Sequence, residues 1–362
     1  MVNVNHSFWR DRSVWISGHT GFKGGWLALW LHELGARIHG FSLEPPTHPC
    51  LFDVTHLKTR LSSDVRADLA DLSSLKRSID EAQPEVVFHL AAQPLVRESY
   101  RNPLATLNCN IMGTAHVLEA IRGVESIQSA LLITTDKVYQ NQEWSYPYRE
   151  VDPLGGHDPY SASKAAAEIV VASYRASFFA ENAVFKAQIA SVRAGNVIGG
   201  GDWAADRLVP DCLRAFAKGE PVRLRFPHAV RPWQHVLEPL SGYLFLAERL
   251  GSQRGEGFAK AWNFGPDIRG NATVGAVAEL VARLWGEQAR VEFESSSGNP
   301  HEAGLLHLDS SMAYSELGWR PRWSLQEALS RTVEWHRAWT NNEDMAAVSL
   351  SQIREYMGVD WL

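Results

Sequence analysis

Short apolar runs alternate with helical patterns through the first half of the chain. The run 13–17 precedes a glycine-rich turn, and Leu27, Trp30, Leu31 and Leu34 then recur at helical spacing. Strands that alternate with helices predict a parallel sheet covered on both faces, in a doubly wound α/β fold of the Rossmann type. Strand candidates lie at 13–17, 37–41, 64–71, 84–92, 129–135 and 187–195, and helical stretches lie at 26–35, 104–121 and 161–179.

The rhythm changes after about Arg193, where glycine, proline and tryptophan interrupt short segments. Such irregular segments favour a smaller C-terminal domain that holds a substrate over the sheet. Most of the 14 tryptophans are expected in the core, although Trp203 is a candidate for stacking on a substrate ring. We expect a dinucleotide-binding domain over 1–190 plus about 231–265, a substrate-binding domain over about 191–230 plus 266–345, and a C-terminal tail over 346–362.

Composition and charge narrow the classes of function. The 362 residues carry a net charge of −6 without a long basic run, which argues against a nucleic-acid partner. No apolar run approaches membrane length and no secretory signal is visible, so we expect a cytoplasmic protein. The three cysteines are scattered and the 14 histidines show no ligand spacing, so neither a disulfide framework nor a metal site is predicted.

A glycine-rich loop joins the first strand candidate to its helix. Gly18, Gly21 and Gly24 stand at G-x-x-G-x-x-G spacing, with Thr20 and Phe22 between them. Glycines there permit a tight turn and close approach of the backbone to a pyrophosphate, and the helix N-terminus offers N–H groups and a positive dipole end. We therefore predict that these residues bind a dinucleotide cofactor; an ordinary glycine-rich turn is the alternative.

The adenosine end of this site lacks one expected residue, the acid that binds the ribose at the end of the second strand. Phe41, Ser42 and Leu43 occupy that place, with Glu44 just beyond, and no arginine follows to meet a 2′-phosphate. NAD is therefore favoured over NADP, although the missing acid leaves the choice open on local grounds. Further cofactor candidates are Asp68, Leu69, Ala91 and Ala92.

Tyr160 and Lys164 stand four residues apart, on one face of a helical stretch. The pKa of a phenol is near 10 in water, so a tyrosine is a poor base at neutral pH. A nearby ammonium and the cation of an oxidised nicotinamide both favour the phenolate. Tyr160 could then take a proton from a substrate hydroxyl as hydride leaves, while Lys164 holds the nicotinamide ribose. Alone, Y-x-x-x-K more often marks a solvated helix face, but its place behind a nucleotide loop favours catalysis.

Six separated motifs resemble the extended short-chain dehydrogenase/reductase family, over nearly the whole chain. They read GHTGFKG, ADLAD, HLAAQ, NIMGT, TTDKVY and YSASK. The resemblance implies a catalytic triad of Thr135, Tyr160 and Lys164 and a nucleotide-sugar substrate bound mainly by the C-terminal region. It also implies a homodimer packed through the helices around 113–124 and 161–179.

The residues after the triad threonine separate branches of this family. Sugar epimerases usually have a small apolar residue there, and dehydratases of dTDP-glucose carry Thr-Asp-Glu, whereas this chain has Thr135, Asp136 and Lys137. Together with EPPTHPCLFD, AAQPLVRESY and GNVIGGGDWAADRLVPD, this pattern resembles the branch of 4,6-dehydratases that acts on CDP-glucose. The resemblance implies a hydro-lyase that oxidises C4, removes water across C5–C6 and returns hydride to C6. It also implies a place in deoxysugar synthesis, such as that of lipopolysaccharide O-antigen.

Asp136 and Lys137 are the candidates for the elimination. A ketone at C4 acidifies the C5 proton, so loss of the C6 hydroxyl needs a base at C5 and an acid at O6. Asp136 is the candidate acid, which requires burial or a like charge to raise its pKa. Lys137 is either the C5 base, with a pKa lowered by roughly three units from about 10.4, or an ammonium that stabilises the enolate oxygen. A surface ion pair between the two is the alternative.

The resemblance also implies contacts to the nucleotide sugar. Asn196 and Arg231 match residues that contact the diphosphate, and Arg207 with Leu208 matches a segment that packs over the base. Gln93, after the fourth strand candidate, could reach the sugar, and Arg97 is a weaker candidate. A turn asparagine and surface salt bridges are the alternatives for these residues.

A 4-epimerase and a non-catalytic dinucleotide-binding scaffold are the two alternative functions. A 4-epimerase needs no acid for a leaving hydroxyl, so Asp136 argues against it. A dinucleotide-sensing scaffold without activity is disfavoured because Tyr160 and Lys164 are both present. The cytosine of the substrate rests on the resemblance alone.

Overall fold

A seven-stranded parallel sheet forms the centre of the computed structural model, which describes residues 4–180, 186–224, 226–252, 255–267, 271–293 and 304–358. The strand order is β11-β6-β5-β4-β1-β2-β3, and every neighbouring pair is parallel. This order confirms the predicted doubly wound α/β fold of the Rossmann type. The strands are β1 (Ser13–Ser17), β2 (Arg37–Ser42), β3 (Ser63–Arg66), β4 (Val86–His89), β5 (Ser129–Ile133), β6 (Gln188–Ala194) and β11 (Ala261–Phe264).

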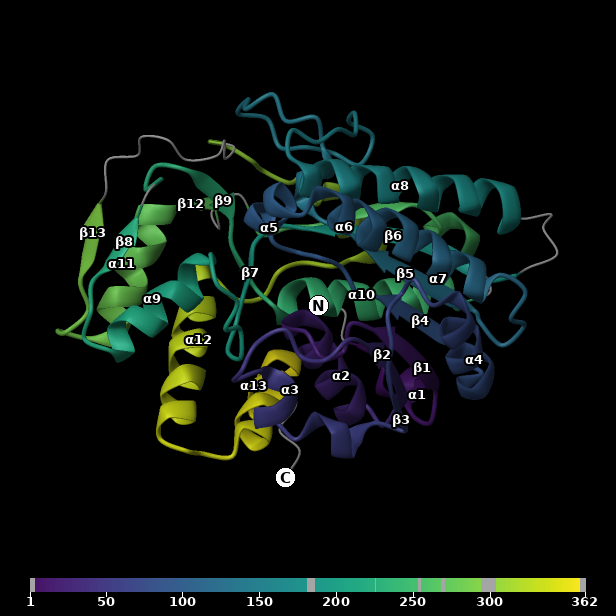
Figure 1. Ribbon diagram of the computed structural model, residues 1–362, viewed down its shortest axis with the longest axis horizontal. Coiled ribbons are helices and arrows are strands. Elements are labelled where there is room, and N and C mark those ends of the chain that lie inside the picture. The colour runs from purple at the N-terminus through teal and green to yellow at the C-terminus, as the bar shows by residue number, and fades with distance from the viewer. Residues whose placement is uncertain are drawn as a thin grey trace.

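Helices cover both faces of the sheet (Figure 1). Alternate residues of a strand face opposite layers: Val14 and Ile16 of β1 belong to one apolar core, and Trp15 belongs to the other. Because both faces are buried, the central strands are almost wholly apolar rather than alternating. The first core contains α2 (Phe22–Glu33), α10 (Leu237–Leu250) and α13 (Met345–Met357), and the second contains α4 (Leu72–Ala82), α7 (Gly113–Ile121) and α8 (Pro159–Phe178).

Six of the strands lie where the sequence predicts them, and the seventh was not predicted. β11 is only Ala261–Phe264 and is followed at once by glycine and proline, so its apolar pattern is too short to recognise. The helix expected over 104–121 is divided into α6 (Pro103–Leu107), a π-helical turn (Asn108–Met112) and α7. Such π turns often lie at functional sites, and Cys109 of this turn lines the cavity described below.

A smaller lobe lies beyond the carboxyl ends of the strands, at the left of Figure 1. Its own apolar core includes Leu213, Val277 and Leu329. Three two-stranded ladders, β7–β10, β9–β12 and β8–β13, belong to this half of the chain. The elements are β7 (Val197–Ile198), α9 (Leu208–Ala217), β8 (Val222–Leu224), β9 (Val230–Pro232), β10 (Gln234–His235), β12 (Asn271–Thr273), α11 (Val274–Trp285), β13 (Val291–Phe293) and α12 (Leu325–Thr340).

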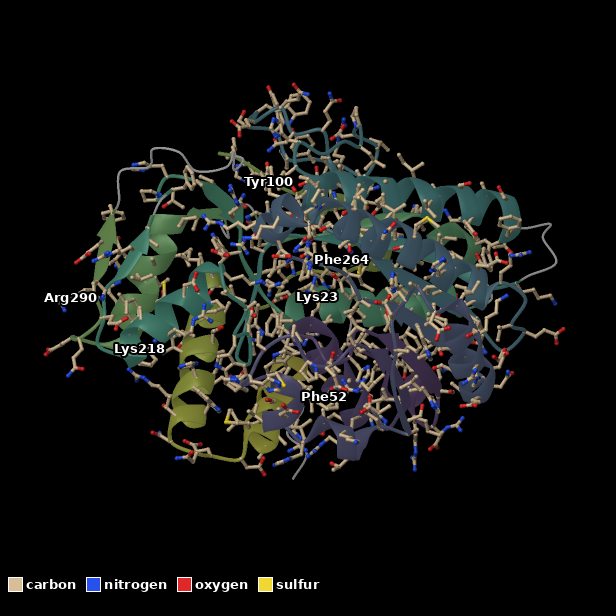
Figure 2. All side chains as sticks on the ribbon, in the orientation of Figure 1. Lys23, Phe52, Tyr100, Lys218, Phe264 and Arg290 are labelled. Carbon is tan, nitrogen blue, oxygen red and sulfur yellow. The ribbon has the colours of Figure 1, made fainter. Side chains whose placement is uncertain are left out.

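Side chains fill the space between these layers: Lys23 and Phe264 lie near the centre, whereas Lys218 and Arg290 lie at the edge of the small lobe (Figure 2). No helix among the described residues combines the length and apolarity needed to cross a membrane. The remaining short elements are α1 (His6–Trp9), α3 (Leu51–Val54), α5 (Val96–Arg101), 3₁₀ turns at Leu57–Arg60, Asp136–Val138 and Gly255–Phe258, and a π turn at Ala313–Leu317.

The C-terminal tail forms a docked helix, α13, which contacts α2 and α12. Glu238 of α10 holds it in place, because its carboxylate accepts a hydrogen bond of 2.6 Å from the hydroxyl of Tyr356. The same carboxylate accepts backbone N–H groups of Arg322 and Trp323. Residues 359–362 of the expected tail lie outside the described residues.

Candidate active site

A cavity of about 1330 Å³ lies over the carboxyl ends of the strands and extends to the small lobe. This is where open α/β sheets bind their ligands. The sequence-predicted residues that line it are Gly18, Thr20, Gly21, Phe22, Gly24, Asp68, Leu69, Ala91, Ala92, Thr135, Asp136, Lys137, Tyr160, Lys164, Asn196, Arg207, Leu208 and Arg231.

The glycine loop has the backbone geometry of a phosphate cradle. Gly18 has a φ of +80°, and a Cβ there would lie 2.7 Å from the backbone nitrogen of Ala91, so only glycine fits without strain. A Cβ on Gly24 would lie 2.1 Å from the carbonyl oxygen of Gly18. Gly21 is the N-cap of α2 and makes no side-chain cap, which leaves the first N–H groups of the helix available to an anion. The loop therefore fits a dinucleotide.

The adenosine end is built from hydroxyl groups. Thr20 Oγ1 lies 2.7 Å from Ser42 Oγ and donates to the carbonyl of Leu43 at 3.1 Å. Although no arginine follows β2 in sequence, Arg66 of β3 donates to the same carbonyl at 3.0 Å. Its guanidinium also pairs with Asp64 at 2.9 Å, so its charge is already neutralised within the protein. Local sequence could not reveal this neighbour, because it comes from another strand.

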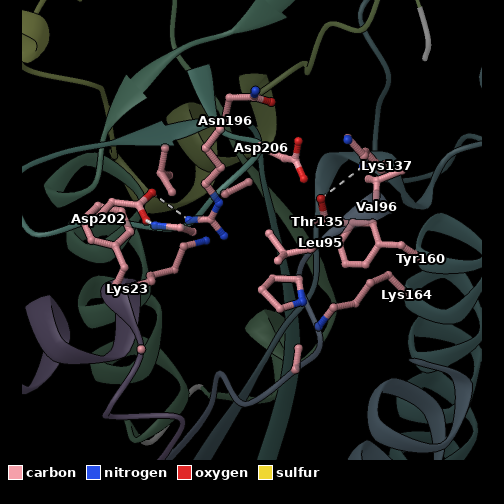
Figure 3. Close-up of a pocket in the computed structure, with 18 of the residues that line it drawn as sticks. Lys23, Leu95, Val96, Thr135, Lys137, Tyr160, Lys164, Asn196, Asp202 and Asp206 are labelled. Carbon is pink, nitrogen blue, oxygen red and sulfur yellow. Dashed lines mark hydrogen bonds and ion pairs between the residues drawn. The ribbon is translucent and has the colours of Figure 1, made fainter. Parts of the chain in front are cut away.

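The three residues of the implied triad meet at one side of the cavity, where Figure 3 shows Thr135, Tyr160 and Lys164 together. Asp158 caps α8 by accepting the Ser161 N–H at 2.9 Å, which sets Tyr160 in the first turn. All three side chains are buried. The ammonium of Lys164 donates to the Ile133 carbonyl at 3.2 Å.

Burial dominates the electrostatics of this triad. Burial raises the pKa of Tyr160 to about 12, although a hydrogen bond with Thr135 lowers it. The charge of Arg207 also lowers this pKa, but burial outweighs it in the protein without cofactor. Burial likewise lowers the pKa of Lys164 to about 8.

Asp136 follows the triad threonine in a short 3₁₀ turn and is buried. Its Oδ1 accepts the Thr135 hydroxyl at 2.9 Å, whereas Oδ2 has no hydrogen-bond partner within the described chain. Burial raises the pKa of Asp136, against the opposing charges of Lys137 and Arg231. The carboxyl group thus has the properties of a proton donor. Lys137 is half-buried and forms no ion pair with Asp136, both residues being within the described chain.

The predicted phosphate ligands line the small-lobe side of the cavity. Arg231 donates to the Val230 carbonyl at 2.9 Å and acts electrostatically on Asp136. Arg207 pairs with Asp202 at 2.7 Å, so the predicted arginine is held by an acid that the sequence analysis did not select. Figure 3 places Asp202 on the side of the cavity opposite the triad, with Asn196 above.

Gln93 is the one predicted site residue that does not line the cavity. Its amide nitrogen donates to the Leu95 carbonyl at 3.1 Å and to Thr106 Oγ1 at 2.9 Å, and its amide oxygen accepts the Leu95 N–H. The side chain therefore orders the segment after β4. Leu95 and Val96 contribute apolar groups beside the triad instead (Figure 3).

Lys23 is the clearest functional candidate that the sequence analysis missed. It lies in the first turn of α2 and points into the cavity (Figure 3), and its ammonium nitrogen lies 5.8 Å from the centroid of the Tyr243 ring. Burial and the charges of Lys164 and Arg207 lower its pKa to about 8. Its place between two motif glycines was the available signal. Among the described residues, no group of three or more His, Cys, Asp or Glu side chains could hold a metal ion.

The sequence of residues 15–332 matches the family model described as GDP-mannose 4,6 dehydratase. The chain belongs to that family. A CDP-glucose 4,6-dehydratase of Salmonella typhimurium is 48% identical over 356 residues, which cover 98% of each chain. The motif-based resemblance to nucleotide-sugar dehydratases is therefore confirmed.

Two solved structures share the fold of this dehydratase family member. A UDP-glucose 4-epimerase of Stenotrophomonas maltophila, with bound NAD and a formylated UDP-arabinopyranose, has a TM-score of 0.78 at 21% identity, covering 91% of this chain and 99% of that chain. A dTDP-glucose 4,6-dehydratase of Bacillus anthracis, in complex with NAD, has a TM-score of 0.75 at 19% identity, covering 92% and 98%.

Proposed function

We propose that the protein dehydrates CDP-D-glucose to CDP-4-dehydro-6-deoxy-D-glucose. The observation that carries this proposal is the buried carboxyl of Asp136, which has an unpartnered oxygen beside a Thr–Tyr–Lys triad. An epimerase has no leaving hydroxyl to protonate, so this group favours elimination. The relative from Salmonella typhimurium, 48% identical over nearly the full chain, supports CDP-glucose as the substrate.

NAD is the proposed cofactor, supported by the fit of the glycine loop and by its presence in both solved relatives. Gly18, Gly21 and Gly24 would hold its diphosphate, and Ser42 with Thr20 the adenosine ribose. When bound, NAD supplies a positive charge beside the triad, takes hydride from C4 and gives it back to C6. It is thus regenerated in each cycle.

In the oxidation, the O4 proton passes to Tyr160, assisted by the Thr135 hydroxyl. The buried phenol is a weak acid in the free protein, so the phenolate must be stabilised by positive charge in the loaded site. Lys164 would contribute its ammonium and would hold the nicotinamide ribose.

In the elimination, the C5–H bond breaks and its electron pair forms the C4–C5 enolate. The C6–O bond then breaks as Asp136 gives its proton to the leaving hydroxyl, which departs as water and leaves a 4-keto-5,6-ene. Return of hydride to C6 forms an enolate again, and the proton held by the C5 base returns to C5 to complete the 4-keto-6-deoxy sugar. Lys137 lies beside Asp136 and is our candidate for the base at C5; its ammonium could instead stabilise the enolate oxygen. Arg231 and Arg207, with Asn196 and Leu208, are proposed to hold the nucleoside diphosphate.

The division of labour between the two lobes is also proposed. We assign dinucleotide binding to 1–190 plus about 231–265, which is supported by the place of α10 and β11 in the central layers. Nucleotide-sugar binding is assigned to about 191–230 plus 266–345, and α13 belongs to the tail.

A homodimer in the cytoplasm is the proposed state of the protein. Ile169 is an exposed apolar side chain on α8, one of the two helices that the sequence analysis selected for pairing. Leu104 on α6 and Met112 in the π turn are also exposed, and they lie just before the other selected helix, α7. Free Cys50, Cys109 and Cys212 are consistent with a reducing compartment.

The decisive test is to supply CDP-glucose deuterated at C4, together with NAD, and to follow the label by NMR. The proposal expects a 4-keto-6-deoxy product that carries deuterium at C6, because the same hydride leaves C4 and returns to C6. A C4 epimer, or no turnover by folded protein with added NAD, would reject the dehydratase function. UDP-glucose, which differs from CDP-glucose only in the nucleobase, is the matched control substrate, and dTDP-glucose is a second control that keeps the same sugar.

A further inference from the structure

A buried carboxylate lies directly behind the catalytic groups. Glu168 is one helical turn beyond Lys164 on α8. Its Oε1 accepts the Thr134 hydroxyl at 2.5 Å, and its Oε2 accepts the Ser191 hydroxyl at 2.7 Å and Arg193 Nη2 at 2.9 Å. Thr134 directly follows β5, and Ser191 and Arg193 belong to β6. The side chain of Glu168 therefore connects the catalytic helix α8 to two neighbouring strands of the sheet.

The network continues from Arg193 toward the loop after β5. Arg193 Nη1 donates to the Tyr139 hydroxyl at 2.9 Å and to the Glu150 carbonyl at 3.2 Å. Tyr139 in turn donates to Asn263 Oδ1 at 2.7 Å, and it lines the cavity. The chain of contacts thus joins α8, β6 and β11 to the segment that carries the catalytic polar groups.

Such a network is a poor way to gain stability alone. The side chains of Arg193 and Glu168 are 4% and 3% exposed, and removal of two charges from water offsets most of their attraction. Burial raises the pKa of Glu168, but Arg193 and the hydroxyl donors outweigh burial and hold the pKa below its usual range. An ionised carboxylate is therefore maintained at neutral pH, one turn from the ammonium of Lys164.

We propose that Glu168 is a positioning residue for the reaction: it fixes the helix carrying Tyr160 and Lys164 against the strand end carrying Thr135, and it keeps a negative charge behind the Lys164 ammonium. The catalytic meaning of this contact rests on the dehydratase function proposed above. The contact itself is a property of the folded chain and can be measured without turnover.

Loss of the negative charge of Glu168 should lower the pKa of Lys164. Glu168 and Cys109 raise the pKa of Lys164 against the burial that lowers it. Without the charge of Glu168 the ammonium loses its proton at lower pH, so the alkaline limb of activity moves to lower pH. His89 of β4 also faces Lys164, but burial lowers its pKa to about 3, so it stays neutral across this range. Burial also lowers the pKa of Lys23 of α2 to about 8, so its signal must be distinguished from that of Lys164.

The first experiment titrates Lys164 in the folded protein. Lysine side chains labelled with carbon-13 are followed by NMR in a Lys23→Gln background, and the Lys164 signal is assigned by its loss in Lys164→Met. We expect the midpoint to fall by about one pH unit in Glu168→Gln. Glu238→Gln is the matched control, because it removes another buried carboxylate that lies among α10, α13 and the 322–323 backbone.

Glu168→Gln leaves Arg193 buried without its carboxylate, so the experiment includes Glu168→Gln/Arg193→Gln, which removes both charges. A smaller fall of the same sign is expected in this variant, because the positive charge of Arg193 is removed together with the carboxylate. With NAD and CDP-glucose, both variants should lose at least tenfold in kcat with KM within about threefold, and the alkaline limb should move down. Glu168→Asp keeps the negative charge, so the alkaline limb of its pH–activity profile should lie closer to that of the parent protein.

An unchanged Lys164 midpoint in folded Glu168→Gln and in the double variant would overturn the proposal. The same shift in Glu238→Gln would overturn it too, since a general loosening of the fold would then explain the result. Should the parent protein fail to turn over CDP-glucose, the proposed function fails, while the lysine titration still decides the role of Glu168.

Discussion

Asp136 holds an unpartnered carboxyl oxygen in a buried position beside the triad. A buried carboxyl group normally has its hydrogen bonds satisfied within the protein. We propose that the C6 hydroxyl of the substrate, the group that leaves in the proposed reaction, is the missing partner of Oδ2. The raised pKa of Asp136 keeps the proton available for that step.

Replacement of Asp136 by asparagine should separate oxidation from water loss. The change keeps the shape of the side chain but removes its transferable proton, so nicotinamide reduction should persist while elimination slows about 10²- to 10⁴-fold. Single-turnover absorbance of the reduced nicotinamide, together with NMR of the product, measures the two steps. In the parent, water loss should decline as pH rises through the raised pKa of Asp136, and the variant should lack that limb. Equal elimination rates would remove Asp136 from the mechanism.

Lys137 has two open roles that isotope exchange can distinguish. If its amine removes the C5 proton, Lys137→Met should abolish uptake of solvent deuterium at C5 while C4 oxidation continues. If its ammonium only stabilises the enolate, exchange should persist at a reduced rate. We expect the first result, because Lys137 lines the cavity next to Asp136. NMR of substrate recovered from deuterated water provides the measurement, with Lys218→Met as an exposed control.

Individual site residues were predictable where a short motif carries them. Thr135, Tyr160 and Lys164 stand in such motifs, and the fold brings them to one wall of the cavity. Lys23 and Asp202 were missed because their significance depends on which groups approach them from other elements. Gln93 was misplaced for the same reason: its neighbours in the fold use up its hydrogen bonds.

At the scale of elements, the glycine loop and α2 act as one unit. α2 is buried on nearly all sides, so residues 24–31 are apolar without interruption. Because neighbouring elements surround the helix, its N-terminus cannot shift to relieve a clash. Gly24 packs so closely against Gly18 that a Cβ on Gly24 would overlap the Gly18 carbonyl oxygen. The loop therefore depends on glycine for packing as well as for ligand access.

Gly24→Ala should impair both folding stability and cofactor binding. The added Cβ would meet backbone atoms of Gly18 and His19, which can move only with the loop, so a loss of about 1–3 kcal/mol in the free energy of unfolding is expected. Urea unfolding and calorimetric titration with NAD measure the two effects. Gly257→Ala is the control, because nothing lies within 4 Å of its Cβ. Parent-like stability and affinity of Gly24→Ala would contradict this account of the loop.

The apolar pattern of the sequence predicts the long elements of the fold but not the short ones. Long strands with helices between them were predictable, because both faces of the sheet are buried and the runs are apolar. β11 was not, since it is four residues long and its place at the sheet edge is decided by pairing with β6. The π turn at Asn108–Met112 was not predicted, because the sequence analysis read 104–121 as one uninterrupted helix.

At the scale of the whole molecule, α10 joins the distant parts of the chain. Glu248 on this helix accepts the Trp9 indole N–H at 2.8 Å, and Glu238 accepts the hydroxyl of Tyr356. The N-terminal segment and α13 are thus fastened to the same central helix. Sequence alone gave no basis for this arrangement, because each contact joins residues more than a hundred positions apart. The two-lobed architecture was predictable only through the change in rhythm after about Arg193.

The proposed dimer places its interface on the α6–α8 face. α6, α7 and α8 lie side by side on one face of the molecule (Figure 1), and α8 contacts both of the others. Leu104 and Ile169 are 75% and 60% exposed there, so both side chains are available to a second copy of the chain. A second copy that packs this face against its own would bury these side chains in an isologous contact.

Ile169→Arg should therefore dissociate the dimer without unfolding the protomer. The introduced guanidinium would be buried without a partner in the paired state, whereas in a monomer it would be solvated. Light scattering coupled to size-exclusion chromatography, over a range of protein concentrations, should show twice the chain mass for the parent and the chain mass for the variant. Phe293→Arg is the matched control, because Phe293 is 56% exposed on β13 in the small lobe. A parent that elutes as a monomer, or an Ile169→Arg variant that remains dimeric, would exclude this face as the interface.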